Sequence, residues 1–493
     1  MKYSGYQKKI FRRVEDTEDN IVIDAVAGSG KSTTLFKIAS LLPDSSILFF
    51  AFNTHIANYA TKKLSKLKNV EVKTTHSYGL SCIRASKKMK ASEMNTSKVW
   101  HYIEANVTNF KLRGLYYNAL STLRTFGCMS YTDKGITKFI KQNPAILNQI
   151  GDTKVLSYAA TIGRMLKELD SQTYHYDFDD MLRLPILYNL FSYGNCPDVL
   201  LVDESQDLNL YQFEFLQHFV DNDVRIIAVG DDDQAIYSFR GACGDALETI
   251  RELCEAKRMP LSITYRCKSK IVDFVHKQYE QEDYSPAIEA YEQGGAVYRI
   301  EGHSKDEYSL GTLLKNNVEM VVSAKNKHII SIWFFLLEQY GVSSSLKGSK
   351  ITTMLTKMFK ALKADGVSYP LIFDELTKRS ESDDETTSDM AIACLRFVSL
   401  QKFSGYDAVF DKIKQLENDT TSKIHLHTVH SAKGMESEKV FVIDDWFDSD
   451  QKLNMRYVAF TRPSDELYVV KPYIPKADLN NARNDAFGNK PKS

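Results

Sequence analysis

Several features that would assign a chain to a class at once are missing from this sequence. Its seven cysteines are scattered and form no Cys-x-x-Cys pair, so neither a zinc site nor a disulfide framework is expected, and a reducing compartment is favoured. The N-terminus has no apolar targeting segment, and no apolar run is long enough to span a bilayer. We therefore expect a cytoplasmic protein without a membrane partner.

A net charge is missing as well. The 63 Lys and Arg residues equal the 63 Asp and Glu residues, so the overall charge does not point to a nucleic-acid partner. The balance does not exclude one either, because a groove can be basic on a protein of zero net charge. A chain of 493 residues is too long for one hydrophobic core, and roughly two to four domains are expected.

The strongest motif present is a glycine-rich turn between a predicted strand and a predicted helix. The apolar run 21–23 precedes Ala-Val-Ala-Gly-Ser-Gly-Lys-Ser-Thr at 25–33, and a helix is predicted over 31–41. Glycines let successive backbone N–H groups point at a polyphosphate, and the helix adds its positive end. Lys31 would reach the β- and γ-phosphates, and Ser32 would bind Mg²⁺. The predicted ATP-binding residues of this turn are Ala27, Gly28, Ser29, Gly30, Lys31, Ser32 and Thr33.

A pair of acids follows a second buried strand. The apolar run 199–202 ends in Asp203 and Glu204. Asp203 is placed to hold the Mg²⁺ that Ser32 contacts, and Glu204 to polarise the attacking water. Two adjacent acids can also form a solvated turn, but four apolar residues before them favour the tip of a buried strand. With the glycine-rich turn, the pair predicts an NTPase that uses ATP and Mg²⁺.

The order of the predicted elements favours an α/β fold. Strand-like runs alternate with helical stretches, as an open parallel sheet requires. The runs lie at 21–24, 47–52, 70–74, 199–202, 224–229, 296–300, 320–323, 424–428, 440–443 and 467–470. The charged run 378–387 is predicted to be a solvated loop. The stretch 111–117 is either a contact to duplex DNA or, as we favour, one face of an amphipathic helix.

These and further motifs resemble those of superfamily 1 helicases of the UvrD/Rep/PcrA group. Asp203-Glu204-x-Gln-Asp resembles motif II of that group, and the other motifs follow in the family's order over nearly the whole chain. The matching segments are residue 7 and ranges 52–55, 75–77, 177–182, 229–242, 265–266, 428–436 and 457–462. The resemblance implies an α/β chain with two RecA-like, parallel-sheet P-loop NTPase domains and mainly helical insertions.

The resemblance also implies where the domains begin and end. The first RecA-like domain would comprise residues 1–81 and 176–255, interrupted by a helical insertion at 82–175. The second would comprise 256–344 and 423–479, interrupted by a small accessory insertion at 345–422. Residues 480–493 would form a flexible tail.

Roles around ATP follow from the resemblance too. Gln7 would hydrogen-bond the edge of adenine, Tyr265 would stack on it, and Glu436 would contact the ribose. Gln234 would contact the γ-phosphate. The implied catalytic residues are Lys31, Glu204, Gln234, Arg266 and Arg462. The two arginines come from the second domain and would also bind ATP, as arginine fingers that act when the domains close.

The DNA contacts implied by the resemblance combine aromatic rings with polar groups. Phe52, Tyr237 and Phe239 would stack on bases of single-stranded DNA without sequence preference. The sugar–phosphate backbone would be contacted by Asn53, His55, Thr75, His76, Arg240, Thr428, His430 and Lys433.

The sequence departs from the family pattern at several positions. Phe239 stands where tryptophan is usual, and His55 replaces a lysine. Thr33 stands where an adenine-contacting arginine often follows the glycine-rich turn, and Pro463 replaces an alanine. The region after position 462 is short for the family, and Tyr473 is the candidate for a short strand-separating pin.

The function that the resemblance implies is an ATP-dependent DNA helicase that translocates 3′→5′ on single-stranded DNA and unwinds duplex. It would act as a monomer on single-stranded DNA and single-strand/duplex junctions, in a bacterial cell or a phage-infected host. Two alternatives stay open: a translocase that displaces proteins with little strand separation, and a DNA-sensing regulatory ATPase subunit of a nuclease complex. A protein loading partner or a separate nuclease stays open as well.

Overall fold

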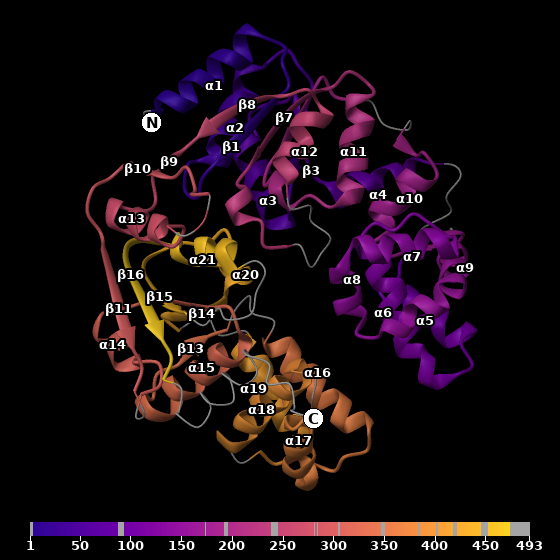
Figure 1. Cartoon of the computed structure of the whole chain (residues 1–493), viewed down its shortest axis with the longest axis vertical. Coiled ribbons are helices and arrows are strands. Elements are labelled where there is room, and N and C mark those ends of the chain that lie inside the picture. The colour runs from indigo at the N-terminus through magenta and orange to yellow at the C-terminus, as the bar shows by residue number, and fades with distance from the viewer. Residues whose placement is uncertain are drawn as a thin grey trace, which may run out of the picture. The chain divides into compact units, whose positions relative to one another are not determined.

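The computed structural model describes residues 3–86, 93–172, 174–191, 196–237, 245–280, 282, 284–303, 306–346, 351–382, 385–400, 403–417, 422–444 and 452–473. The chain divides into two compact units, Met1–Ile263 and Thr264–Ser493. Each unit contains a parallel sheet of six strands with helices packed against it (Figure 1). The expected α/β class with two parallel, RecA-like sheets is confirmed.

The sheet of unit 1 is buried between two layers of helices. Its strands lie in the order β3 (Val70–Thr74), β2 (Ile47–Ala51), β6 (Val199–Val202), β7 (Arg225–Gly230), β1 (Ile21–Ala25), β8 (Lys257–Leu261). Side chains alternate between the faces, so Ile21 and Ile23 enter one apolar cluster while Val22 enters the other. One layer consists of α1 (Gly5–Asp16), α2 (Lys31–Leu41) and α3 (Thr54–Leu64); the other of α4 (Thr75–Ala85), α10 (Asp180–Leu187), α11 (Leu210–Val220) and α12 (Ala246–Leu253).

Strand β8 places the end of unit 1 later than the expected boundary at 255/256. Residues Lys257–Leu261 pair in parallel with Ile21–Ala25 of β1, so this segment belongs to the first sheet and not to the second domain. Its sequence, Lys-Arg-Met-Pro-Leu, has no apolar alternation and contains Pro260, which weakens the strand signal. A proline is tolerated here because β8 is an edge strand.

The helical insertion of unit 1 has a hydrophobic core of its own. It contains α5 (Lys98–Asn106), α6 (Phe110–Thr125), α7 (Asp133–Gln142), α8 (Pro144–Ile150) and α9 (Ala159–Asp170). Two short strands, β4 (Glu93–Met94) and β5 (His175–Tyr176), pair in parallel where the chain enters and leaves it. The stretch 111–117 lies in α6, where Leu112, Leu115 and Tyr116 pack against the core while Lys111 and Tyr117 are exposed. The favoured amphipathic helix is therefore what the structure has.

Unit 2 builds its sheet in the order β11 (Ala296–Glu301), β16 (Pro463–Lys471), β15 (Ser437–Ile443), β12 (Met320–Ser323), β14 (Ile424–Thr428), β13 (Ser344–Ser345). A small pair, β9 (Ile263–Thr264) and β10 (Glu289–Ala290), lies outside it. The helices are α13 (Ser269–Lys277), α14 (Leu310–Lys315), α15 (Asn326–Tyr340), α16 (Ile351–Ala364), α17 (Ile372–Ser380), α18 (Glu385–Leu400), α19 (Tyr406–Glu417), α20 (Val429–Ala432) and α21 (Lys452–Phe460). Helices α15 to α19 share one apolar cluster with the sheet.

The predicted loop at 378–387 is wrong over most of its described residues. Lys378, Arg379 and Ser380 end α17, and α18 begins at Glu385. Arg379 pairs with Glu375 at 3.0 Å and with Asp365 at 2.7 Å, so its charge stabilises the helix and its neighbour. A charged run can therefore form the solvated face of a helix.

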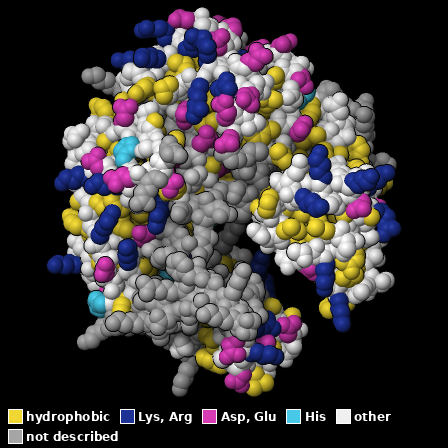
Figure 2. Space-filling view, in the orientation of Figure 1, with side chains coloured by type: hydrophobic (Ala, Val, Ile, Leu, Met, Phe, Trp, Pro, Cys, Tyr) yellow, Lys and Arg dark blue, Asp and Glu magenta, His cyan; other side chains and the backbone are white. Residues whose placement is uncertain are grey.

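Within the part of the chain that the structure describes, no helix is long and apolar enough to cross a membrane. On the face shown in Figure 2, acidic and basic side chains are interspersed over unit 1, as the equal numbers of acids and bases allow.

Candidate active site

The glycine-rich turn links β1 to α2 in the shape that a phosphate requires. Gly28 and Gly30 have φ of 70° and 84°, a left-handed conformation that other residues rarely adopt, and Gly30 caps the N-terminus of α2. The hydroxyl of buried Ser29 donates to the carbonyl oxygen of Val26 at 2.8 Å. Strand and helix therefore hold the turn from both sides, with the helix N-terminus at the open end.

Parallel strands bring the predicted ATP and Mg²⁺ residues to one edge of the sheet. Ser32 Oγ donates to Asp203 Oδ2 at 2.8 Å, although the two residues lie far apart in sequence. Lys31 Nζ lies 3.9 Å from Oδ2 of Asp231, the residue that follows β7. Because β1, β6 and β7 end at the same edge, the turn, Asp203 and Asp231 meet there.

The acids at this edge are buried and crowded. Asp203 is almost fully buried, and burial together with neighbouring Glu204 raises its pKa from 3.8 to about 7, although Ser32 and Lys31 lower it. Burial and nearby Asp24 also raise the pKa of Asp232 to about 7. Mg²⁺ is typically held by one or two carboxylates, with other oxygens completing its shell, so the Ser32–Asp203 pair fits this ion.

A chain of side-chain hydrogen bonds fixes the second acid, Glu204. Buried Gln206 donates from Nε2 to Glu204 Oε2 at 2.6 Å, and its Oε1 accepts from the Asp231 N–H at 3.1 Å. Gln234 Nε2 in turn donates to Asp231 Oδ2 at 2.5 Å. Glu204 has φ of 52°, uncommon for a residue other than glycine, and such strain concentrates at functional sites. The predicted residues Glu204 and Gln234 are thus joined through Gln206 and Asp231, which the sequence analysis did not assign.

Gln7, which is predicted to contact adenine, lies against the glycine-rich turn. It is buried, its Nε2 donates to Thr34 Oγ1 at 3.1 Å, and its Oε1 accepts from the Ser4 N–H at 3.0 Å. Thr34 in turn donates to the Gly30 carbonyl at 2.9 Å. The amide therefore caps α1 and supports the turn, and an adenine contact would use its second Nε2 proton.

In unit 2 the predicted arginines are held by protein groups. Arg462 is fully buried and donates to the carbonyl oxygens of Val458 at 2.7 Å and Met435 at 3.1 Å. Arg266 Nε donates to Glu436 Oε2 at 2.6 Å, so two residues with separate predicted roles are paired. The ring of Tyr265 is partly exposed, as a stacking role requires.

Of the predicted DNA contacts in unit 1, two aromatic rings lie together. Phe52, which follows β2, stacks on Tyr237 with ring centroids 5.8 Å apart and planes 25° from parallel. Asn53 Oδ1 accepts from the Ile56 N–H and so caps α3, while His55 is exposed in the first turn of that helix. Phe239 and Arg240 lie outside the described residues.

A second aromatic pair lies at the start of α4. The His76 ring lies 4.9 Å from Phe178, whose side chain is 58% exposed, and burial lowers the pKa of His76 to about 4. The sequence analysis gave Phe178 no role. Its position between Asp177 and Asp179 did not indicate that its ring is exposed. Thr75 is buried and its hydroxyl accepts from Gln212 Nε2 at 2.8 Å, which gives this side chain a packing contact.

The predicted DNA residues of unit 2 surround the short helix α20. Thr428 ends β14, and its Oγ1 accepts from the Ser431 N–H at 3.3 Å, so it caps the helix. His430 and Lys433 are half-buried on and just after α20. Their common origin at the end of one strand keeps the three residues near each other.

Comparison with known proteins places this arrangement in a family. The family model described as the UvrD/REP helicase N-terminal domain matches residues 6–255. This chain belongs to the UvrD/Rep helicase family. The resemblance drawn from the sequence motifs is therefore confirmed.

Three relatives show how far the similarity extends. The ATP-dependent DNA helicase Rep of Escherichia coli (strain K12) is 38% identical over 103 residues, 20% of this chain and 15% of Rep. The ATP-dependent DNA helicase PcrA of Leuconostoc citreum is 26% identical over 298 residues, 55% of this chain and 38% of PcrA. The F-box DNA helicase protein 1 of Schizosaccharomyces pombe is 20% identical over 519 residues, 94% of this chain and 56% of that protein. The chain spans less than two thirds of each relative.

The UvrD/Rep family match covers the site unevenly. It contains the glycine-rich turn, Asp203, Glu204 and Gln234, and it ends before Arg266 and the other predicted residues of unit 2. Family membership thus rests on the N-terminal half, where the acids and the phosphate turn meet.

Proposed function

We propose that this UvrD/Rep family member is an ATP-dependent DNA helicase that translocates 3′→5′ on single-stranded DNA and unwinds the duplex. The observation that carries the proposal is the 2.8 Å hydrogen bond between Ser32 and buried Asp203, beside Lys31. It brings a phosphate-binding turn and a metal-binding carboxylate together at one sheet edge. A DNA substrate is supported by the names of the relatives Rep and PcrA.

The reaction at unit 1 is in-line transfer of the γ-phosphoryl group to water. The turn and Lys31 orient the β- and γ-phosphates. Ser32 and Asp203 would hold Mg²⁺, which would neutralise charge on the phosphate oxygens. Glu204 orients the attacking water and accepts its proton while Gln206 holds the carboxylate in place. The bond from water oxygen to phosphorus forms as the bond to the β-phosphate oxygen breaks, leaving ADP and phosphate.

Unit 2 contributes positive charge and the second hold on DNA in this proposal. Arg266 and Arg462 stabilise the charge that develops on the transferring group, so hydrolysis requires the two RecA-like units to close on ATP. Phe52 and Tyr237 stack on bases, and Thr428, His430 and Lys433 contact the backbone. Alternating hold by the two units then moves the strand. The insertions at 82–175 and 345–422 are proposed accessory domains.

Steady-state ATPase assays with and without oligo-dT, and unwinding of duplexes with a 3′ or a 5′ tail, test the proposal. We expect strong stimulation by oligo-dT and unwinding only from the 3′ tail. Stimulation without unwinding would replace the helicase by a translocase. No stimulation would overturn both.

Two variants test the chemistry separately from DNA binding. Lys31→Ala and Glu204→Gln should each lower the oligo-dT-stimulated rate by ~10²-fold or more, since each removes a group aimed at the transferring phosphoryl or at water. Fluorescence anisotropy should show that both still bind oligo-dT. Lys37→Ala in the same helix is the control and should leave the rate unchanged. Loss of DNA binding with the fold intact would contradict separate ATP and DNA sites.

A further inference from the structure

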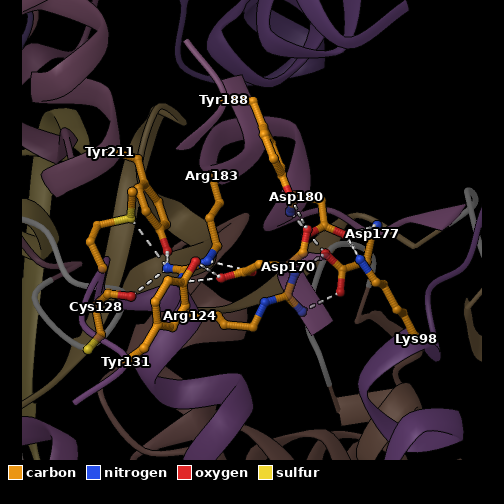
Figure 3. Close-up of polar contacts among 11 residues, drawn as sticks. Lys98, Arg124, Cys128, Tyr131, Asp170, Asp177, Asp180, Arg183, Tyr188 and Tyr211 are labelled. Atoms are coloured by element: carbon orange, nitrogen blue, oxygen red, sulfur yellow. Dashed lines mark hydrogen bonds and ion pairs between the residues drawn. The ribbon is translucent and has the colours of Figure 1, made fainter. Parts of the chain in front are cut away.

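A buried cluster of charges lies where the helical insertion of unit 1 meets the layer containing α10 (Figure 3). Arg124 of α6 is fully buried and donates from Nη1 to Asp177 Oδ2 at 2.6 Å and from Nη2 to Asp177 Oδ1 at 2.8 Å. The same Nη2 donates to Asp180 Oδ1 at 2.6 Å. Lys98 of α5 donates to the other oxygen of Asp180 at 2.6 Å. Two helices of the insertion therefore bind Asp177, which precedes α10, and Asp180, its first residue.

The two acids also bind each other's backbone. The Asp177 N–H donates to Asp180 Oδ2 at 3.1 Å, and the Asp180 N–H donates to Asp177 Oδ1 at 3.0 Å. These reciprocal bonds close residues 177–180 into a turn at the N-terminus of α10. Arg124 spans both carboxylates and thereby holds both sides of that turn.

A second buried arginine continues the joint. Arg183 of α10 donates to Asp170 of α9 at 2.8 and 2.6 Å and to the hydroxyl of Tyr211 on α11 at 2.9 Å. Tyr131 also donates to Asp170. Figure 3 shows Tyr131 and Asp170 of the insertion converging with Arg183 and Tyr211.

Apolar packing of the insertion does not explain why buried ion pairs connect it to α10. Its apolar residues form a cluster separate from the two clusters of the sheet. Buried ion pairs are often no more stabilising than apolar side chains of the same volume, because removing the charges from water is costly. What such pairs add is directional geometry, since the planar guanidinium fixes two carboxylates at once.

The turn that Arg124 holds carries the exposed ring of Phe178. Phe178 lies inside the turn 177–180, is 58% exposed, and lies 4.9 Å from His76, a predicted DNA contact. We propose that Arg124 is a positioning residue for DNA binding. By clasping Asp177 and Asp180 it fixes the turn that presents Phe178 beside His76, and it couples the helical insertion to that surface. The inference rests on the proposed function, because it requires the chain to bind single-stranded DNA.

A double-mutant cycle in oligo-dT affinity tests the clasp. Arg124→Lys keeps the charge balance of the buried cluster and removes the two-pronged contact. Phe178→Ala should weaken binding by about tenfold, the order expected for one stacked base, and Arg124→Lys by about fivefold. The double variant should be no weaker than Phe178→Ala alone, because both changes remove the same contact. A general loss of structure would instead weaken binding in either background.

A control and a DNA-free measurement separate the possible results. Arg225→Lys changes another buried arginine of unit 1, which donates to the backbone of Val14 and Asp19, and should leave binding unchanged. Hydrogen exchange at 177–183 should be faster in Arg124→Lys and unaltered in Arg225→Lys. If Arg124→Lys does not fold, Asp177→Asn, which keeps an acceptor for the Asp180 N–H, should give the same cycle.

The outcomes distinguish the two proposals. If the wild-type chain binds oligo-dT, two results would overturn the positioning role alone. One is that the effects of Arg124→Lys and Phe178→Ala are additive. The other is that hydrogen exchange at 177–183 is unchanged in Arg124→Lys. No binding of oligo-dT by the wild-type chain would overturn the proposed function and this inference together.

Discussion

In unit 1 the candidate site gathers crowded acids, whereas in unit 2 its arginines are bonded to oxygen atoms of the protein. Asp203 is buried beside Glu204, and its raised pKa of about 7 reflects that burial and crowding. Arg462 is buried too, but it donates hydrogen bonds to backbone carbonyl oxygens. The difference lies in how each unit holds charge: unit 1 crowds carboxylates beside the phosphate turn, and unit 2 holds its buried arginine in a preset direction.

The largest expected effect is on ATP hydrolysis and comes from a substitution in unit 2. Arg462→Lys keeps the positive charge and loses the fork that donates to Val458 and Met435. If Arg462 stabilises the transferring phosphoryl group, oligo-dT-stimulated hydrolysis should fall by ~10³–10⁵-fold. Binding of a fluorescent ATP analogue should weaken far less than hydrolysis, because lysine keeps the charge and the phosphate turn lies in unit 1.

A matched control for that variant is Arg456→Lys in α21, the helix that ends two residues before Arg462. Arg456 pairs with Asp444 at 3.3 Å and is not assigned to the reaction. Its substitution should leave hydrolysis nearly unchanged. Loss of the folded structure in Arg462→Lys, seen as a lower thermal unfolding midpoint, would show that the arginine serves structure and not the reaction.

The next prediction tests the burial and crowding of the acids in unit 1 through the pH dependence of stability. Because the folded protein holds the Asp203 proton more tightly than an ordinary carboxyl does, it loses stability as pH rises from about 4 to about 7. Asp203→Asn has no such proton to lose. Without Mg²⁺, its thermal unfolding midpoint should exceed that of the wild type above pH 7, and the gap should shrink toward pH 4.

The matched control is Asp198→Asn, at the residue that precedes β6, just as Asp203 follows it. Hydrogen bonds from Ser46 lower the pKa of Asp198, so this carboxylate stabilises the fold above its unfolded pKa and loses that effect as pH falls. Its variant should therefore show the opposite pH trend. A wild type and an Asp203→Asn variant with parallel pH profiles would contradict the buried, crowded acid.

On the DNA side, the units are expected to contribute different kinds of affinity. Phe52→Ala in unit 1 should weaken oligo-dT binding by roughly 5- to 100-fold, as expected for a stacked base, with no change in salt dependence. Lys433→Gln in unit 2 should weaken it less and reduce the salt slope by about 0.7, the value for one released counterion on a single strand. Anisotropy titrations between low and moderate salt measure both. Equal slopes for both variants would contradict this division.

The sequence predicted the parts of the fold whose local pattern and tertiary role agree. The strands Val199–Val202 and Ile424–Thr428 and the helix Lys31–Leu41 have the predicted limits, since apolar runs and a glycine turn bound them. Strand β8 was missed because Lys-Arg-Met-Pro-Leu has no apolar alternation; the segment is a strand because it pairs with β1. The Ser32–Asp203 contact was predictable because parallel strands end at one edge. The Gln206 bridge was not, because it depends on the left-handed backbone of Glu204.

The smallest expected effect concerns His76, a predicted DNA contact. Burial lowers the pKa of His76 in unit 1 to about 4, and it does the same for His427 in unit 2, which precedes Thr428. His76 is therefore neutral at pH 6 and at pH 8, and it can offer DNA a hydrogen bond but no charge. His76→Gln should weaken oligo-dT binding by about threefold, the worth of one such bond, and by the same factor at both pH values. A histidine of ordinary pKa would gain a charge near pH 6 and make its loss costlier there. A larger effect at pH 6 would thus show that DNA binding opens the contact with Phe178 and exposes the ring to water.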